Sequence, residues 1–312
     1  MPFAASIPLP DTSRDSCESL RCLVRLNNVI GESPVWCADR QHLVWADIEQ
    51  QRVYQLDIPS NHLTEFPVDI GITALVPTSS GDWIAASRTG LYRLTPDFQT
   101  AYLLLDPEAD RPGIRLNDAI ADRQGRLWTG SLCDDRLDAP VGRLFRLDPD
   151  LRCTQSDAGF AVANGLCTSP DNRTLYAVDM FNHSIRQYTH DPVTGELGPA
   201  RVFVQLAEHE GKPDGLCCDA EGGIWVCHWG GGCVSRFDAR GQLSYRLQLP
   251  VSQPTRCTFG GPDLRDLFIC SARFGLPEAA LDNEPLAGSV FTVRVPWTGL
   301  PEPAFEAGKL PS

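Results

Sequence analysis

The chain of 312 residues carries a formal net charge of −13 at pH 7, with 42% hydrophobic and 21% charged residues. This composition is typical of a folded protein with a sizeable core, and the acidic balance argues against a binder of nucleic acid or of anionic membranes. The 26 glycines and 25 prolines predict many turns and argue against a helical bundle.

No apolar run approaches the roughly 18 residues of a membrane-spanning helix, and the N-terminus lacks the regions of a secretory signal. The 12 cysteines are scattered, without any Cys-x-x-Cys pair, and several stand inside apolar runs. Free buried thiols in a reducing cytoplasm are the favoured interpretation, and a zinc cluster or a disulfide framework is the alternative. We therefore expect a cytoplasmic protein without a membrane partner.

Short apolar and aromatic runs recur along the chain, about 40 to 50 residues apart. In chain order they are LVWAD (43–47), WIAAS (83–87), LWTGS (127–131), LYAVD (175–179), IWVCH (224–228) and LFICS (267–271). Most follow a polar turn and precede a second strand-like run such as VYQLD (53–57) or LFRLD (144–148).

Each unit thus holds three or four strands, which is the size of one propeller blade, and there are six units. The sequence predicts an all-β fold, a six-bladed β-propeller with a central channel. A β-sandwich gives no reason for six phased copies, and a solenoid repeat is usually shorter. We expect one domain over 1–312 with its core at about 25–295, and closing strands, caps or tails at 1–20 and 295–312.

An earlier strand in each unit begins about 15 residues before the end of the apolar run. The residues at that point, called the ring positions below, are Glu32, Thr73, Asn117, Asn164, Asp214 and Thr255. Because the innermost strand of every blade lines the channel, we expect them to form a ring at one end of it. An Asn-Gly or Asp-Gly pair alone is typical of a turn. Two carboxylates and two amides in one ring favour a site for a hard divalent cation instead.

Five motifs in order carry a resemblance to a known family. They are GESPVW (31–36), RLND (115–118), NGL (164–166) with SPD (169–171), PDGL (213–216) with DAEGGIW (219–225), and CTFGG (257–261). Together they resemble the SMP-30/gluconolactonase/luciferin-regenerating enzyme family over residues 25–295. The resemblance implies a six-bladed propeller with a single divalent metal in its channel.

The resemblance also implies the roles of particular residues. It makes Glu32, Asn164 and Asp214 the metal ligands, and it matches the family's substrate-binding Arg-x-Asn pair to Arg115 and Asn117. In some relatives the asparagine is itself a ligand, so Asn117 is expected to touch either substrate or metal.

Hydrolysis of a lactone needs a polarised carbonyl, an activated water and a stabilised oxyanion. We expect Asp214 to act as the general base, with Glu32 as the alternative, because spacing does not distinguish two coordinating carboxylates. Arg115 and Asn117 are expected to hold substrate oxygens. His228, beside Trp229 at a strand end, is a candidate substrate contact, and packing is its alternative role.

The leading hypothesis is therefore a metal-dependent hydrolase that opens a sugar lactone to the aldonic acid, with Ca, Mg, Mn, Zn or Fe(II) as the cation. A hydrolase of organophosphates or other esters and a non-catalytic calcium-binding propeller are the alternatives. The sequence has no G-x-S-x-G elbow and no P-loop, which disfavours a serine esterase or a nucleotide enzyme. The expected partner is a small molecule, and the expected state is a monomer or weak homo-oligomer.

Overall fold

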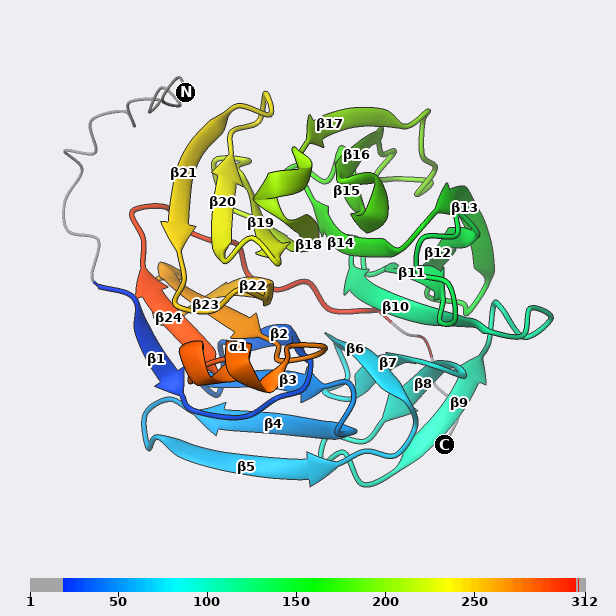
Figure 1. Ribbon diagram of the computed structural model, residues 1–312. Coiled ribbons are helices and arrows are strands. Elements are labelled where there is room, and N and C mark those ends of the chain that lie inside the picture. The colour runs from blue at the N-terminus through cyan, green and yellow to red at the C-terminus, as the bar shows by residue number, and fades with distance from the viewer. Residues whose placement is uncertain (1–18, 307, 309–312) are drawn as a thin grey trace, which may run out of the picture.

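The computed structural model describes residues 19–306 and 308, so most of the N-terminal segment 1–20 lies outside the described residues. Within the described part, 24 β-strands form six antiparallel sheets of four strands each. The six sheets surround a common axis as blades (Figure 1). The predicted six-bladed β-propeller is confirmed.

The blades follow one another in chain order, and in the first three the strands run from the innermost to the outermost. Blade 1 contains β2 (Gly31–Cys37), β3 (His42–Asp47), β4 (Arg52–Asp57) and β5 (His62–Pro67). Blade 2 contains β6 (Ile72–Pro77), β7 (Trp83–Ser87), β8 (Gly90–Leu94) and β9 (Ala101–Leu105). Blade 3 contains β10 (Ile114–Ala121), β11 (Leu127–Cys133), β12 (Gly142–Leu147) and β13 (Cys153–Phe160).

The second half of the ring is built in the same way until its last blade. Blade 4 contains β14 (Ala163–Thr168), β15 (Thr174–Asp179), β16 (Ser184–Thr189) and β17 (Arg201–Gln205). Blade 5 contains β18 (Lys212–Cys218), β19 (Ile224–Trp229), β20 (Cys233–Phe237) and β21 (Leu243–Gln248). Blade 6 contains β22 (Pro254–Gly260), β23 (Asp266–Ser271), β24 (Val290–Arg294) and, as its outermost strand, the N-terminal β1 (Arg21–Val24).

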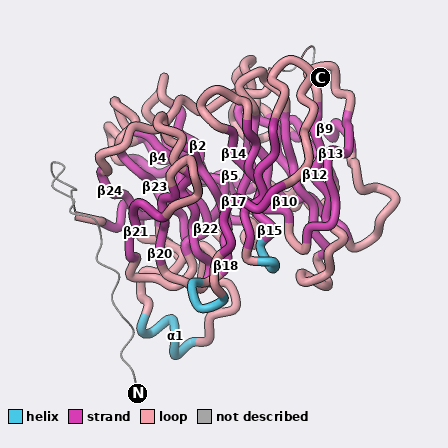
Figure 2. The backbone as a smooth tube through the Cα atoms, turned by 90° about the horizontal axis from the view of Figure 1, so that it is seen from above, coloured by secondary structure: helices cyan, strands magenta, loops and turns pink. Residues whose placement is uncertain are grey.

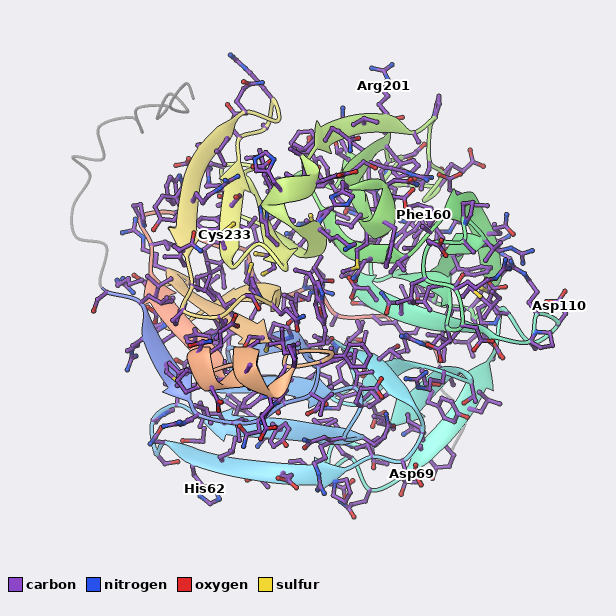
Figure 3. The ribbon with its side chains drawn as sticks, in the orientation of Figure 1. His62, Asp69, Asp110, Phe160, Arg201 and Cys233 are labelled. Atoms are coloured by element: carbon purple, nitrogen blue, oxygen red, sulfur yellow. The ribbon has the colours of Figure 1, made fainter. Side chains whose placement is uncertain are left out.

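The apolar runs found in the sequence are the second strands of the blades. Strands β7 and β11 are buried along their whole length, whereas the outer strand β5 is mostly exposed or half-buried. A strand covered on both faces by neighbouring blades needs apolar residues at successive positions, which explains the runs. Figure 3 shows the contrast, with His62 and Arg201 at the rim and Phe160 inside.

In two blades the polar turn before the second strand holds the inner half of the blade together. In blade 3 the carboxylate of Asp122 accepts a hydrogen bond from the Trp128 indole at 3.1 Å. In blade 5 Asp219 accepts the same bond from Trp225 at 2.9 Å. Both indoles are fully buried, so each bond satisfies a donor that water cannot reach.

A β-bulge interrupts every inner strand close to its ring position. The pairing with the second strand shifts between the residues 32/35, 72/74, 116/119, 164/166, 213/216 and 254/257. A bulge bends a strand and redirects the side chains beside it. The six bulges therefore explain why polar residues can leave the blades and point into the channel at one level.

The two faces of the disc differ. The short helices of the described residues, η1 (Met180–Asn182), η2 (Glu208–Glu210) and α1 (Glu278–Asn283), gather on one face (Figure 2). On the other face the C-terminal segment 299–306 crosses the end of the channel, and its fully buried Phe305 donates its amide to the Pro77 carbonyl at 2.8 Å. None of the described helices is long and apolar enough to cross a membrane.

Candidate functional site

A cavity of about 440 Å³ lies where the inner strands begin, on the face that carries the short helices. Five of the six ring positions line it: Glu32, Thr73, Asn117, Asn164 and Asp214. The sixth, Thr255, is turned away, and its hydroxyl donates to the Gly31 carbonyl and so ties β22 to β2. Side chains from η1 and from the loop before α1 add an apolar rim, including Met180, Phe181 and Phe274.

Two buried carboxylates face this cavity from blades 1 and 5, which only blade 6 separates. Glu32 is 8% exposed and Asp214 is 4% exposed. Burial raises the pKa of Glu32 to about 8, with Arg256 acting in the opposite direction and Asp118 adding to the rise. Burial, together with the negative charges of Glu32 and Asp118, raises the pKa of Asp214 well above its usual range. The pair therefore resists ionisation unless a positive charge comes to it.

A buried arginine close to these carboxylates is already paired with another acid. Arg256, buried on β22, pairs with the carboxylate of Asp118. Burial alone would lower the pKa of Arg256, but Asp118 and Glu32 outweigh it, so the pKa rises and the guanidinium stays charged. Asp118 also accepts the backbone N–H of Leu166 at 3.0 Å, which joins β10 to β14. Within the described part of the chain, Arg256 is therefore paired with Asp118, and no ion pair reaches Glu32 or Asp214.

Oxygen atoms without protein partners point to the same ligand chemistry. The Thr73 hydroxyl and the Gln253 side-chain carbonyl are buried at the cavity and have no hydrogen-bond partner among the described residues. A buried polar atom left unpaired is costly, so such atoms call for water or an ion. Together with Glu32 and Asp214 they make an oxygen-rich lining, which suits a hard divalent cation.

Asn164 needs one adjustment to join this set. Its amide N–H donates to Asp214, and its side-chain oxygen accepts the Gly165 backbone N–H at 3.0 Å. A half-turn of the amide would direct the oxygen toward Asp214, where a cation could lie between them, and the two orientations have the same shape. No group of three or more His, Cys, Asp or Glu side chains among the described residues is arranged to hold a metal, so the amide is required. With it, the residues fit a cation.

Arg115 and Asn117 stand together at the side of the cavity. The guanidinium of Arg115 donates to Asp134 at 2.7 Å and to the Asn117 side-chain oxygen at 3.2 Å. Asn117 in turn donates to the Ala163 carbonyl at 3.2 Å, which fixes its amide. The structure thus places the predicted pair on the cavity wall, with Asp134 as an anchor.

His228 is not among the residues that line the cavity. It is fully buried in β19, where its Nδ1 lies 2.9 Å from the Glu210 carbonyl. Burial lowers its pKa, so the neutral ring donates to that carbonyl. Its neighbour Trp229 lines the cavity instead. Direct contact of His228 with a substrate stays a prediction.

Two charged residues near the site, Arg256 and Asp134, are not among those that the sequence predicts. Arg256 follows the ring position Thr255, and an arginine inside a buried inner strand was the available signal. Asp134 comes directly after β11, and no spacing marks it. Its role depends on Arg115 and Arg88 reaching it from two neighbouring blades.

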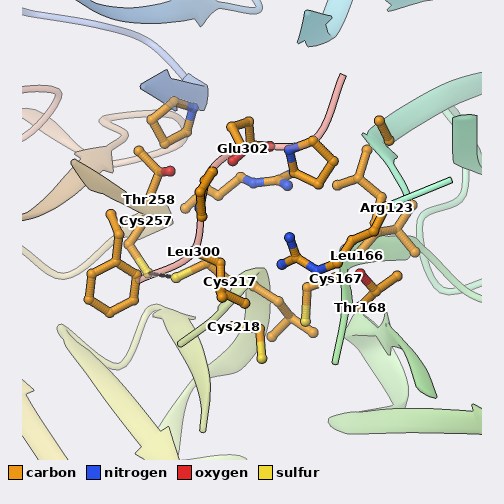
Figure 4. A pocket seen from close by; sticks show the side chains of 18 residues that line it. Arg123, Leu166, Cys167, Thr168, Cys217, Cys218, Cys257, Thr258, Leu300 and Glu302 are labelled. Atoms are coloured by element: carbon orange, nitrogen blue, oxygen red, sulfur yellow. Dashed lines mark hydrogen bonds between the residues drawn. The ribbon is translucent and has the colours of Figure 1, made fainter. Parts of the chain in front are cut away.

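A second cavity, of about 60 Å³, lies at the other end of the inner strands (Figure 4). It is lined by Cys167, Cys217, Cys218, Cys257, Arg123, Arg256 and Glu302, among others. The sulfur atoms of Cys217 and Cys257 lie 3.6 Å apart, without a disulfide. Every cysteine in the described part of the chain is a free thiol, as expected. We call this the thiol end of the channel, and the end with Glu32 and Asp214 the carboxylate end.

Comparison with known proteins supports this picture. Residues 30–273 match the family model of the SMP-30/Gluconolactonase/LRE-like region. The chain is 36% identical over 291 residues to a 6-deoxy-6-sulfogluconolactonase of Pseudomonas putida, covering 92% of this chain and 99% of the relative. A calcium-binding regucalcin of Agrobacterium tumefaciens superposes with a TM-score of 0.88 at 30% identity, covering 92% of this chain and 97% of that one.

A solved luciferin-regenerating enzyme is also similar, with a TM-score of 0.85 at 26% identity and coverage of 94% and 99% of the two chains. The match to the family model and the 36% identical relative confirm the expected enzyme class, a hydrolase of the lactonase type. The chain therefore belongs to the SMP-30/gluconolactonase/LRE-like family.

Proposed function

We propose that this protein hydrolyses a sugar lactone to the aldonic acid with the help of one divalent cation held by Glu32, Asn164 and Asp214. The observation that carries the proposal is the pair of buried carboxylates, both with a raised pKa, on one cavity of about 440 Å³. A relative named as a sugar lactonase and a neighbour described as calcium-binding support the substrate class and the cation respectively.

The cation, when bound, would polarise the lactone carbonyl and make a water more acidic. Asp214 accepts the proton of the attacking water, because its carboxylate lies on the cavity and the cation, when bound, would keep it ionised. Glu32 is the alternative base, since it faces the same cavity. The water oxygen bonds to the carbonyl carbon, the bond from that carbon to the ring oxygen breaks, and the proton taken by Asp214 passes to the ring oxygen, which leaves as a hydroxyl group of the open-chain acid.

The wall that carries Arg115 orients the sugar. Arg115 offers planar donors to ring or hydroxyl oxygens, and its bonds to Asp134 and Asn117 hold the guanidinium in place. The apolar rim of Met180, Phe181 and Phe274 covers the sugar face and excludes bulk water. This combination favours a polar, hydroxylated substrate over a purely apolar ester.

The test is hydrolysis by chelated protein to which single divalent cations are returned. Calcium, magnesium, manganese, zinc and iron(II) are each added, and acid release is followed on a panel of aldono-1,4- and 1,5-lactones. Some lactones should be opened only after a cation is returned, and spontaneous opening is subtracted with the Asp214→Asn variant. Hydrolysis that persists after chelation would refute the cation, and no hydrolysis at all with a cation bound would refute the lactonase assignment.

A further inference from the structure

Lys212 stands out by its rarity and its place. The chain uses arginine almost throughout for positive charge and has only two lysines, Lys212 and Lys309. Lys212 is the first residue of β18, two positions before Asp214, and it lines the same cavity. It is half-buried, and its backbone pairs with that of Trp229 on β19.

The charge of Lys212 is not neutralised by the described part of the protein. Within the described residues, its ammonium forms no ion pair with a carboxylate, and it lies against the Phe181 ring, 5.2 Å from Nζ to the ring centre. The other cation of the cavity wall, Arg115, is bound to Asp134. An ammonium over an aromatic face is held without being neutralised. Lys212 therefore offers an available positive charge to whatever enters the cavity.

Its position relative to Asp214 sets what it can reach. Two residues along a strand correspond to roughly 7 Å, and half-buried Lys212 precedes buried Asp214 on β18. This spacing is comparable to the length of a six-carbon sugar lactone. When the lactone carbonyl lies by Glu32 and Asp214, the far end of the sugar comes to Lys212, Phe181 and Trp229, which all line the cavity.

We propose that Lys212 binds an anionic group on the terminal carbon of the lactone, so that the preferred substrate is a charged sugar lactone. This inference rests on the proposed function. A carboxylate, a phosphate or a sulfonate offers the same chemistry, oxygen atoms that accept charge-assisted hydrogen bonds. The net charge of −13 repels anions at long range, so their capture needs a cation within the cavity, inside the screening distance of about 8 Å.

The test compares wild type with Lys212→Met, which keeps the apolar stem on Phe181, and with Lys212→Arg, which keeps the charge. The substrates are gluconolactone and the lactones that carry a 6-phosphate, a 6-sulfonate or a terminal carboxylate. Lys212→Met should lower the ratio of kcat/KM for charged over neutral lactone by roughly tenfold or more, and Lys212→Arg should restore most of it. The three anions separate the possible sources of the charge.

Arg273→Met is the matched control, because Arg273 stands beside the cavity-lining Phe274 but does not line the cavity itself. It should leave the ratio within about twofold of wild type. An unchanged ratio in Lys212→Met, or a wild-type preference for gluconolactone over all three anions, would overturn the inference while the lactonase assignment stands.

A binding measurement keeps the inference testable without turnover. Calorimetry with 6-phosphogluconate and with gluconate should show tighter binding of the phosphorylated acid to wild type, and loss of that preference in Lys212→Met. If wild type opens no lactone, the proposed function fails, and this measurement still decides the role of Lys212. Equal affinity for the two acids in wild type would refute it.

Discussion

The two ends of the channel are built from the same six strands, yet they serve different purposes. At the carboxylate end, bulges turn polar side chains into a cavity of about 440 Å³. At the thiol end, cysteines and the segment that contains Leu300 and Glu302 leave a cavity of only about 60 Å³. The difference teaches that each inner strand supplies chemistry where it begins and packing where it ends.

The most direct test of this difference is to substitute one residue at each end of the same strand, β18. Asp214→Asn keeps the size of the side chain but removes the base and one ligand, so kcat/KM for a lactone should fall by about 1,000-fold or more. Cys217→Ser lies on the same strand at the thiol end and should change kcat/KM less than about twofold. Both are checked by acid release, with circular dichroism to confirm folding. A similar loss in both variants would show that the two ends are not independent.

A smaller effect is expected at the cavity wall. Arg115→Ala removes the guanidinium that faces the substrate but no predicted ligand, so KM should rise about tenfold with a lesser change in kcat. Cation affinity, measured by calorimetry, should stay close to that of wild type. Weaker cation binding in Arg115→Ala would instead place this residue in the metal site.

The smallest expected effect is on stability and depends on pH. In the folded, metal-free protein the pKa of Glu32 is about 8, whereas in an unfolded chain it is about 4.3. The folded state therefore binds more protons between these values, and the free energy of unfolding falls as pH rises through this window. Glu32→Gln cannot ionise, so its free energy of unfolding should fall less between pH 5.5 and 8.5.

Urea denaturation in the presence of a chelator measures this difference. At acid pH, where Glu32 is protonated in both states, wild type and Glu32→Gln should differ least. Parallel curves for the two proteins across the whole window would mean that Glu32 ionises freely, and the carboxylate end would then be more open to water than its burial implies.

The sequence was informative wherever a residue repeats with the blades. Glu32, Asn164 and Asp214 come together because the inner strands share one bulge position. The same reasoning failed for Thr255. Its short side chain donates a hydrogen bond to the Gly31 carbonyl of the neighbouring strand and so does not line the cavity. His228 stands near the end of β19. Successive side chains of a strand point to opposite faces, so His228 lies inside the blade and its neighbour Trp229 lines the cavity.

The rim of the cavity could not be predicted from spacing. Phe181 and Phe274 lie outside the strands, and their positions depend on contacts between blades rather than on a repeat. Arg256 and Asp118 form an ion pair although they are 138 residues apart in the sequence, and no local sequence pattern predicts such a contact. Specificity is therefore the part of the site that is hardest to infer from sequence, because it is carried by the least periodic residues.

The sixth blade has a consequence for how the chain is made. Its outermost strand β1 pairs Arg21 with Thr292, so residues from near both ends of the chain share one sheet. During synthesis on a ribosome the ring cannot close until β24 has emerged. Until then β1 has no strand to pair with in blade 6. Contacts so distant in sequence slow folding. A nascent chain therefore passes through an open ring, in which the unpaired strand edges of the incomplete blade are exposed to other chains.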